Sequence, residues 1–208
     1  MMRLALLGPA DGDSVALRNR AQLALGPLGA DRVIYLGDDE IFDAALEYWA
    51  REIVAGDPSD AALWDRAVKT CAGADHATID AFVGRERERE KLRNVTCLPH
   101  AGARAVELFS GVVTLIIHDK ALLDRDDLVQ SRLIVFGSGS QPTIERDGSC
   151  ALVSPGPLVH PRGGVLMLED DASGIVCTIL NGAGEQFKQE RVVSLSRGVP
   201  SMSPGMKA

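Results

Sequence analysis

Stretches of apolar and polar residues divide the chain into a helical first part and a strand-rich second part. Residues 3–7 form a short apolar run, residues 14–25 carry apolar side chains at helical spacing, and residues 32–36 form a second apolar run. Asp13 or Ser14 is placed to cap the helix. This order predicts a βαβ unit whose two strands are parallel neighbours.

Helical patterning continues over residues 39–92. It predicts helices at about 40–55, 61–71 and 78–92, with a break after the first of them at Gly56-Asp57-Pro58-Ser59. The last helix ends in a run of alternating charges, residues 85–91, in which opposite signs meet at i,i+3. We interpret this run as a solvated helix face rather than a nucleic-acid patch.

Short strands are predicted after residue 92, separated by turn residues such as Asp147-Gly148. They cover residues 94–98, 103–109, 112–118, 132–136, 143–146, 149–153, 165–169 and 175–180, whereas 120–130 is either a short helix or a loop. We expect an α/β first half and an antiparallel second half, forming two packed sheets with helices outside. The folded domain is expected to cover residues 1–182, and 183–208 to be a polar, partly disordered extension.

Composition narrows the function classes. The chain has 208 residues, 46% of them hydrophobic and 25% charged, as expected for one globular domain. A formal net charge of −7 and only 4% aromatic residues disfavour nucleic-acid binding. We expect a cytoplasmic protein that does not insert into a membrane, because no apolar run is long enough to span one and the N-terminus does not resemble a signal peptide. The four cysteines form no C-x-x-C pair and are expected to be reduced thiols.

Acidic residues follow two of the expected parallel strands. Asp11 and Asp13 come after the first strand, and Asp38, Asp39 and Glu40 come after the second. Open α/β sheets bind ligands at the carboxyl ends of their strands. This edge of the sheet is therefore the first candidate site.

Several segments, taken in order, resemble motifs of the calcineurin-like metallophosphoesterases, in particular their small bacterial and archaeal phosphodiesterase branch. The family motifs D-x-H-G, G-D, G-N-x-x, strand-terminal H-G, G-H-T-H-x-P and N-P-G-S align with residues 9–12, 37–38, 93–96, 118–119, 137–142 and 154–157. The resemblance implies a two-sheet β-sandwich flanked by helices, an αββα architecture. Residues of about 40–92 would then be a helical insertion.

The resemblance also implies ligand positions for two metal ions, and this chain retains part of them. The degenerate positions are Pro9, Asp11, Ser138 and Ser140. The candidate metal ligands that remain are Asp38, Asn94 and His118, with Asp11 as a possible addition. A full dinuclear site is therefore not expected. We expect either no cofactor or one weakly bound divalent ion, Mn²⁺, Zn²⁺ or Fe²⁺.

Each remaining ligand candidate also has an ordinary structural alternative. Asp38 could cap the following helix, Asn94 could be a turn residue, and His118 could be a hydrogen-bonded core histidine. Gly137 and Gly156 are expected to shape the backbone of their loops rather than to take part in chemistry.

These features predict a degenerate phosphoesterase-fold protein, non-catalytic or very weakly active, that works as a scaffold or regulator with a protein partner. Tyr48, Trp49 and Trp64 of the insertion, with the polar tail, are candidate binding surfaces, although core packing is expected for at least one tryptophan. One alternative is an active metal-dependent phosphoesterase or phosphodiesterase with a remodelled site that acts on a phosphoester ligand. The other is a single-metal or phosphate-binding sensor without turnover.

Overall fold

The computed structural model describes residues 2–100, 102–109, 111–171 and 173–194. Its strands form a six-stranded sheet in the order β11-β10-β9-β1-β2-β3 and a five-stranded sheet in the order β4-β5-β6-β8-β7. The six-stranded sheet consists of β1 (Arg3–Leu7), β2 (Arg32–Tyr35), β3 (Val95–Cys97), β9 (Val165–Asp171), β10 (Gly174–Leu180) and β11 (Gln186–Ser194). The five-stranded sheet consists of β4 (Arg104–Phe109), β5 (Val112–Ile117), β6 (Leu133–Phe136), β7 (Thr143–Asp147) and β8 (Cys150–Ser154).

The two sheets pack face to face around one apolar core. Leu6 and Leu166 of the six-stranded sheet share this core with Ile116 and Val135 of the five-stranded sheet, and all four are fully buried. Such layers stay together because each sheet removes the apolar face of the other from water.

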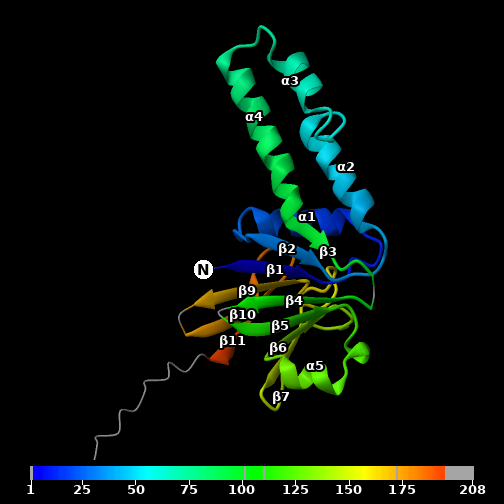
Figure 1. Ribbon diagram of the computed structural model, residues 1–208, viewed down its shortest axis with the longest axis vertical. Helices are drawn as coiled ribbons and strands as arrows, with labels where there is room; N and C mark the ends of the chain where they lie inside the picture. Colours follow the sequence, from blue (N-terminus) through cyan, green and yellow to red (C-terminus); the bar gives the residue numbers. More distant parts are fainter. Residues whose placement is uncertain (1, 101, 110, 172, 195–208) are drawn as a thin grey trace, which may run out of the picture.

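Helices cover the outer faces of both sheets (Figure 1). The helices are α1 (Ser14–Leu25), α2 (Phe42–Val54), α3 (Leu63–Cys71), α4 (His76–Lys91) and α5 (Arg125–Gln130), with short 3₁₀ turns η1 (Leu92–Asn94) and η2 (Lys120–Leu122). Helix α1 packs Leu17 and Ala21 against Val33 of β2, and α5 packs Leu128 against Ile134 of β6. Asp13, one of the two residues expected as the cap, caps α1 by accepting hydrogen bonds from the backbone N–H groups of Val15 and Ala16. The αββα architecture is confirmed.

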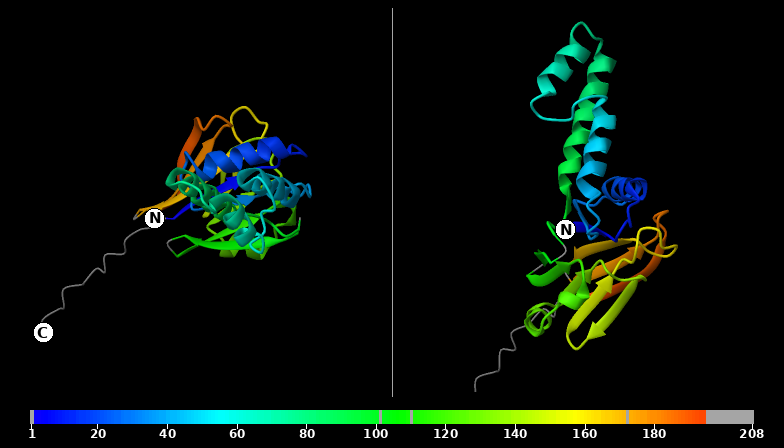
Figure 2. Two further views of the ribbon diagram at one scale, coloured as in Figure 1. Left: turned by 90° about the horizontal axis from the view of Figure 1, so that it is seen from above. Right: turned by 90° about the vertical axis from the view of Figure 1, so that its right-hand side faces the viewer.

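The helices of the insertion, α2, α3 and α4, form an arm that projects from the body (Figures 1 and 2). Trp49 lies at the base of the arm in the core, with 7% of its surface exposed, whereas Trp64 at the start of α3 is 77% exposed. The expectation that one tryptophan is a core residue is thus confirmed. The charged run 85–91 is a solvated face only in part, because Arg89 is buried by its ion pairs.

The strand directions of the second half differ from the expectation of an antiparallel sheet. Strand β6 is parallel to β5 and to β8, and only the β4–β5 and β7–β8 pairs of this sheet are antiparallel. The segment 120–130 forms η2 and α5, which cross from the end of β5 back to the start of β6. A crossover of this kind makes the two strands it joins parallel.

The described fold extends beyond residue 182, where the sequence pattern predicts its end. Gln186–Ser194 form β11, which pairs antiparallel with β10 at the edge of the six-stranded sheet. Val192 is the one buried residue of this strand, so its sequence lacks the apolar alternation that signals a strand. Residues 195–208 of the expected extension lie outside the described residues.

All four cysteines are free thiols, and three of them, Cys97, Cys150 and Cys177, lie in strands as expected. Burial raises the pKa of the Cys177 thiol, which therefore stays protonated as a small core residue. None of the helices in the described part of the chain has the length and apolar character needed to cross a membrane.

Candidate functional site

Four loops meet at the edge where β1, β2, β5 and β6 end. Backbone hydrogen bonds join them: the Leu36 N–H donates to the Leu7 carbonyl oxygen, and the Gly137 N–H donates to the His118 carbonyl oxygen. The loops therefore bring together the residues that follow two strands of each sheet. This is the edge at which the acidic residues predict a site.

His118 and Asp38 form the central pair of this edge. The Nδ1 atom of His118 lies 2.6 Å from the Leu36 carbonyl oxygen, and its Nε2 atom lies 3.2 Å from Oδ2 of Asp38. A carbonyl oxygen only accepts, so Nδ1 carries a hydrogen and Nε2 is turned to the carboxylate. The imidazole is 13% exposed and the Asp38 side chain is 51% exposed. This arrangement fixes the ring orientation while leaving the carboxylate open to solvent.

Tyr35 and Asp39 form a second polar connection, which the sequence patterns did not indicate. The Tyr35 hydroxyl donates to Oδ1 of Asp39 at 2.8 Å and accepts from the Ala10 N–H at 2.8 Å. The other Asp39 oxygen accepts from the Gly12 N–H at 3.0 Å. Burial raises the pKa of Tyr35, so its hydroxyl remains a donor at neutral pH. Two features of the sequence could have indicated this connection: the adjacent acids Asp38 and Asp39 after β2, and Tyr35 at the end of that strand.

Two residues at degenerate ligand positions, Ser138 and Pro9, take part in hydrogen bonds of the loops. Ser138 donates from Oγ to Oδ1 of Asp119 at 2.9 Å, and the same oxygen accepts from the Ala121 N–H at 2.9 Å. These hydrogen bonds, led by the one from the Ala121 backbone, lower the pKa of Asp119. Ser140 is exposed, and Pro9 takes part through its carbonyl oxygen, which accepts from the Leu158 N–H at 2.8 Å.

Asp11 lies in the loop after β1, exposed and with a φ of +51°. A positive φ is uncommon for a residue with a side chain, and aspartate is one of those that tolerate it. The adjacent Gly12 N–H is the donor to Asp39. The structure thus places Asp11 at the candidate edge, and it gives Asp11 no contact with Asp38 or His118 among the described interactions.

Asn94 does not lie with the other candidates. It ends η1 and precedes β3, whose register pairs Val33 with Val95 and Tyr35 with Cys97 in parallel. Asn94 is therefore level with Arg32 at the start of β2, whereas Asp38 lies beyond the end of that strand. The rise from Arg32 to Tyr35 alone separates them by roughly 10 Å at about 3.3 Å per residue. The segment that follows the carboxyl end of β3 contains His100 instead. The motif match does not bring Asn94 to the candidate site, because Asn94 comes before β3 rather than after it.

Two glycines allow the loops to approach this closely. A Cβ at Gly37 would lie 2.2 Å from the Tyr35 hydroxyl oxygen, and one at Gly137 would lie 2.5 Å from the Leu36 carbonyl oxygen. The expectation that Gly137 shapes the backbone agrees with this contact.

The residues present do not fit a dinuclear metal centre. Proline has no side-chain donor, Ser138 is hydrogen-bonded to Asp119, and Asn94 lies at the opposite end of the sheet. Within the described ranges, no group of three or more His, Cys, Asp and Glu side chains is arranged to hold a metal ion. Of the candidate ligands, Asp38 and His118 place two donor atoms side by side that could contact one cation.

Comparison with known proteins identifies the fold. No protein-family model matches the sequence, and no curated protein matches it. A predicted phosphoesterase from Streptococcus pneumoniae superimposes with a TM-score of 0.51 at 14% identity, covering 91% of this chain and 97% of that chain. An archaeal phosphodiesterase is also similar, with a TM-score of 0.49 and 10% identity, covering 86% of this chain and 100% of that chain. Vps29 of Cryptosporidium parvum has a TM-score of 0.48 and 10% identity, covering 91% of this chain and 94% of that chain. The chain therefore has the calcineurin-like metallophosphoesterase fold, to which an arm of three helices is added.

Proposed function

We propose that this protein is a scaffold or regulator built on a metallophosphoesterase fold, with little or no hydrolytic activity and with a protein as its partner. One observation carries the proposal. Of the seven ligand positions that the family resemblance marks, Asp38 and His118 are the two that lie in contact, and Pro9 occupies a position where the family has a ligand. Two-metal hydrolysis requires donors for both ions, because both act on the attacking water.

The polar residues at the strand ends have a structural role that needs no substrate. His118 connects the loop after β5 to the backbone of Leu36, and Tyr35 connects Asp39 to the loop after β1. Hydrogen bonds of this kind satisfy groups that would otherwise be buried without partners. These residues therefore stabilise the fold of a scaffold even where no catalysis takes place.

The arm supplies a surface for protein contacts. Trp64 and Tyr48 expose 77% and 61% of their surfaces to solvent, and Val68 exposes 66%. Exposed large apolar residues that gather on one projecting element are typical of interaction sites.

A hydrolysis assay tests the proposal. The wild-type protein, Asp38→Ala and His118→Ala are incubated with bis(p-nitrophenyl) phosphate in Mn²⁺, Zn²⁺ and Ni²⁺, and the purified protein is analysed for metal content. We expect all three proteins to match the rate of the protein-free control. A rate above that control that both substitutions abolish would overturn the proposal in favour of an active phosphoesterase with a remodelled site.

A single-ion sensor is the second candidate, because one histidine nitrogen and one carboxylate oxygen are held side by side. Anchoring of the other ring nitrogen by a backbone carbonyl is also common for metal-bound histidines. Calorimetric titration with Mn²⁺ tests this candidate. Binding heat that is lost in Asp38→Ala and His118→Ala but kept in Asn94→Ala would support it, and the absence of heat in the wild type would exclude it.

A further inference from the structure

Residues 56–73, which we call the α3 segment, are joined to the rest of the arm by a glycine at each end. Helix α2 stops at Ala55, whose left-handed backbone (φ +53°) is followed by Gly56, and Gly73 follows α3 with a φ of +71°. A Cβ at Gly56 or at Gly73 would meet nothing within 4 Å, so no neighbouring group crowds either backbone. Hinges are commonly a few residues between elements that absorb changes in φ and ψ.

The α3 segment adds little apolar burial to the arm. Its apolar residues Leu63 and Ala67 are half-buried, and none of the nine residues of α3 is fully buried. Within the described ranges, no member of the α3 segment belongs to the apolar clusters of the core. Two hollows of about 430 and 610 Å³ border α3 and α4, and the half-buried Phe82 of α4 lines both of them. The apolar packing that ordinarily fixes a surface helix is therefore small here.

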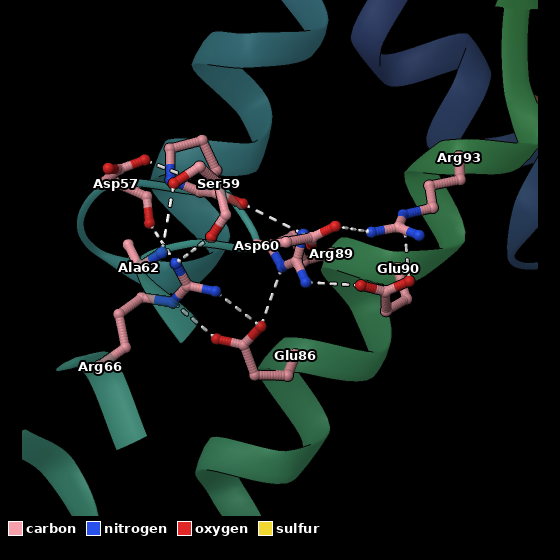
Figure 3. Close-up of polar contacts among 10 residues, drawn as sticks. Asp57, Ser59, Asp60, Ala62, Arg66, Glu86, Arg89, Glu90 and Arg93 are labelled. Carbon is pink, nitrogen blue, oxygen red and sulfur yellow. Dashed lines mark hydrogen bonds and ion pairs between the residues drawn. The ribbon is translucent and has the colours of Figure 1, made fainter. Parts of the chain in front are cut away.

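Charged side chains hold the α3 segment against α4 (Figure 3). Arg66 donates from Nε and Nη2 to the two carboxylate oxygens of Glu86 at 2.8 and 3.0 Å. Arg89 donates to the Pro58 carbonyl oxygen at 3.1 Å and pairs with Asp60 at 3.0 Å. The side chains of Arg66, Glu86 and Arg89 are 9–13% exposed, so water competes little for these contacts. Charge-assisted bidentate contacts are strong but need one geometry, so they hold α3 in a single position.

Other contacts connect the parts of the α3 segment to each other. Arg66 donates to the carbonyl oxygens of Asp57 and Ser59, which joins α3 to the loop before it (Figure 3). The Ala62 N–H donates to the Ser59 carbonyl oxygen at 3.3 Å, within the same loop. Loop and helix therefore share one central side chain, and both lose their place when the contacts to α4 break. Segments connected in this way open cooperatively.

We infer that the α3 segment is a hinged flap, which opens from α4 as one unit while the rest of the arm keeps its structure. Helices α2 and α4 stay in place because Trp49 of α2 and Leu92, directly after α4, are buried in the core. Opening uncovers the surface of α4 around Phe82 and Glu86, which the closed flap partly covers. The flap thus controls access to that surface. This inference goes beyond the proposed function, because neither hydrolysis nor a protein partner enters into it.

Hydrogen–deuterium exchange of the full-length protein, read by mass spectrometry of its peptides, tests the inference. A detached helix of nine residues is marginal in water, so opening leaves the amides of α3 unprotected. In the wild type we expect these amides to exchange about 100-fold or more faster than those of β1, after correction for intrinsic rates, because local opening needs less free energy than global unfolding. Low concentrations of urea should change the exchange of α3 little, since opening exposes little surface.

Two variants that each remove one positive charge from α3 identify the contact that holds the flap. Arg66→Gln should accelerate exchange in α3 and in residues 57–62 about 10-fold or more and leave β1 unchanged, because it removes the bidentate contact with Glu86. Glu86 keeps its ion pair with Arg89 at 2.8 Å, so α4 should remain folded. Lys69→Gln, at an exposed position of the same helix, is the matched control and should keep the wild-type rates.

Three results would overturn the inference. Amides of α3 that are protected as well as those of β1 in the wild type would show that the segment does not open separately. Equal acceleration of residues 84–91 of α4 in Arg66→Gln would mean that the arm opens as a whole. Equal acceleration by Lys69→Gln would show that the contact with Glu86 does not hold the flap. The hydrolysis assay has a different readout, so failure of one proposal is distinguishable from failure of the other.

Discussion

His118 connects the two sheets through its contacts with Asp38 and Leu36. Its Nε2 atom lies 3.2 Å from the Asp38 carboxylate, and its Nδ1 atom donates to the Leu36 carbonyl oxygen at 2.6 Å. His118 follows β5 of the five-stranded sheet, whereas Leu36 and Asp38 follow β2 of the six-stranded sheet. The contact therefore holds the loops at the edge where this fold has its candidate site.

The hydrogen bond from His118 to Leu36 predicts that two substitutions at His118 lower the free energy of unfolding by different amounts. His118→Ala leaves the Leu36 carbonyl oxygen without its donor and should lower the free energy of unfolding by about 1–3 kcal/mol. His118→Asn can place an amide N–H near the former Nδ1 position and should cost less than the alanine variant. Urea unfolding of the three proteins measures the difference. Equal losses in both variants would show that the hydrogen bond to Leu36 is not what stabilises this edge.

The Tyr35 hydroxyl predicts a second measurable loss. Tyr35→Phe removes the donor to Asp39 and the acceptor for the Ala10 N–H, so stability should fall by about 1–3 kcal/mol. Tyr48→Phe is the control, because Tyr48 is 61% exposed and should change stability by less than about 0.5 kcal/mol. Thermal unfolding of both variants tests the comparison. If they behave alike, the network around Tyr35 does not contribute to stability.

Local signals in the sequence were sufficient for much of this fold. The cap at Asp13, the two apolar runs around α1 and the break at residues 56–59 each act over a few residues, and the structure confirms them. Asp38 and His118 were expected to lie together through the family resemblance, whose G-D and strand-terminal H-G motifs come after apolar strands, and the structure places them 3.2 Å apart. Strand ends are positions that a sequence pattern defines well when the strand is apolar throughout.

Features that depend on distant partners could not be read in the same way. Asn94 fitted a motif by order along the chain, and the parallel pairing of β3 with β2 is what shows that it lies at the other end of the sheet from Asp38. Strand β11 is polar because it lies at a sheet edge, and Arg89 is buried because Glu86 and Asp60 surround it. Trp49 and Trp64 have similar helical contexts, and only the packing of the arm separates core from surface.

The close approach of the loops predicts that Gly137 resists even a methyl group. A Cβ there would meet the Leu36 carbonyl oxygen at 2.5 Å, so Gly137→Ala should move one loop and destabilise the fold by about 1–3 kcal/mol. A Cβ at Gly84, in the middle of α4, would meet nothing within 4 Å, so Gly84→Ala should stabilise the helix by about 0.5–1 kcal/mol. Urea unfolding followed by circular dichroism should give opposite signs for the two variants. A loss of stability in Gly84→Ala would contradict this description of the arm.

Acid should weaken the arm through Glu86. Its hydrogen bond from the Arg66 guanidinium holds the pKa of Glu86 below its ordinary value of 4.5. In the unfolded chain the pKa returns to that value, so the unfolded state binds more protons once the pH falls near 4.5. The stabilisation is therefore complete above that pH and is lost as the pH falls through the lower folded pKa.

Two matched variants isolate this effect from the general response of the chain to acid. Glu86→Gln should remove part of the loss of helical signal between neutral and acidic pH, because its side chain no longer takes up a proton. Glu88→Gln should keep the wild-type profile, since Glu88 is 58% exposed and pairs with Lys91 outside the network. Helicity followed by circular dichroism across the pH range compares the three proteins. Coinciding profiles for wild type and Glu86→Gln would mean that Glu86 does not couple the arm to pH, and a changed profile in Glu88→Gln would assign the coupling to the exposed charges instead.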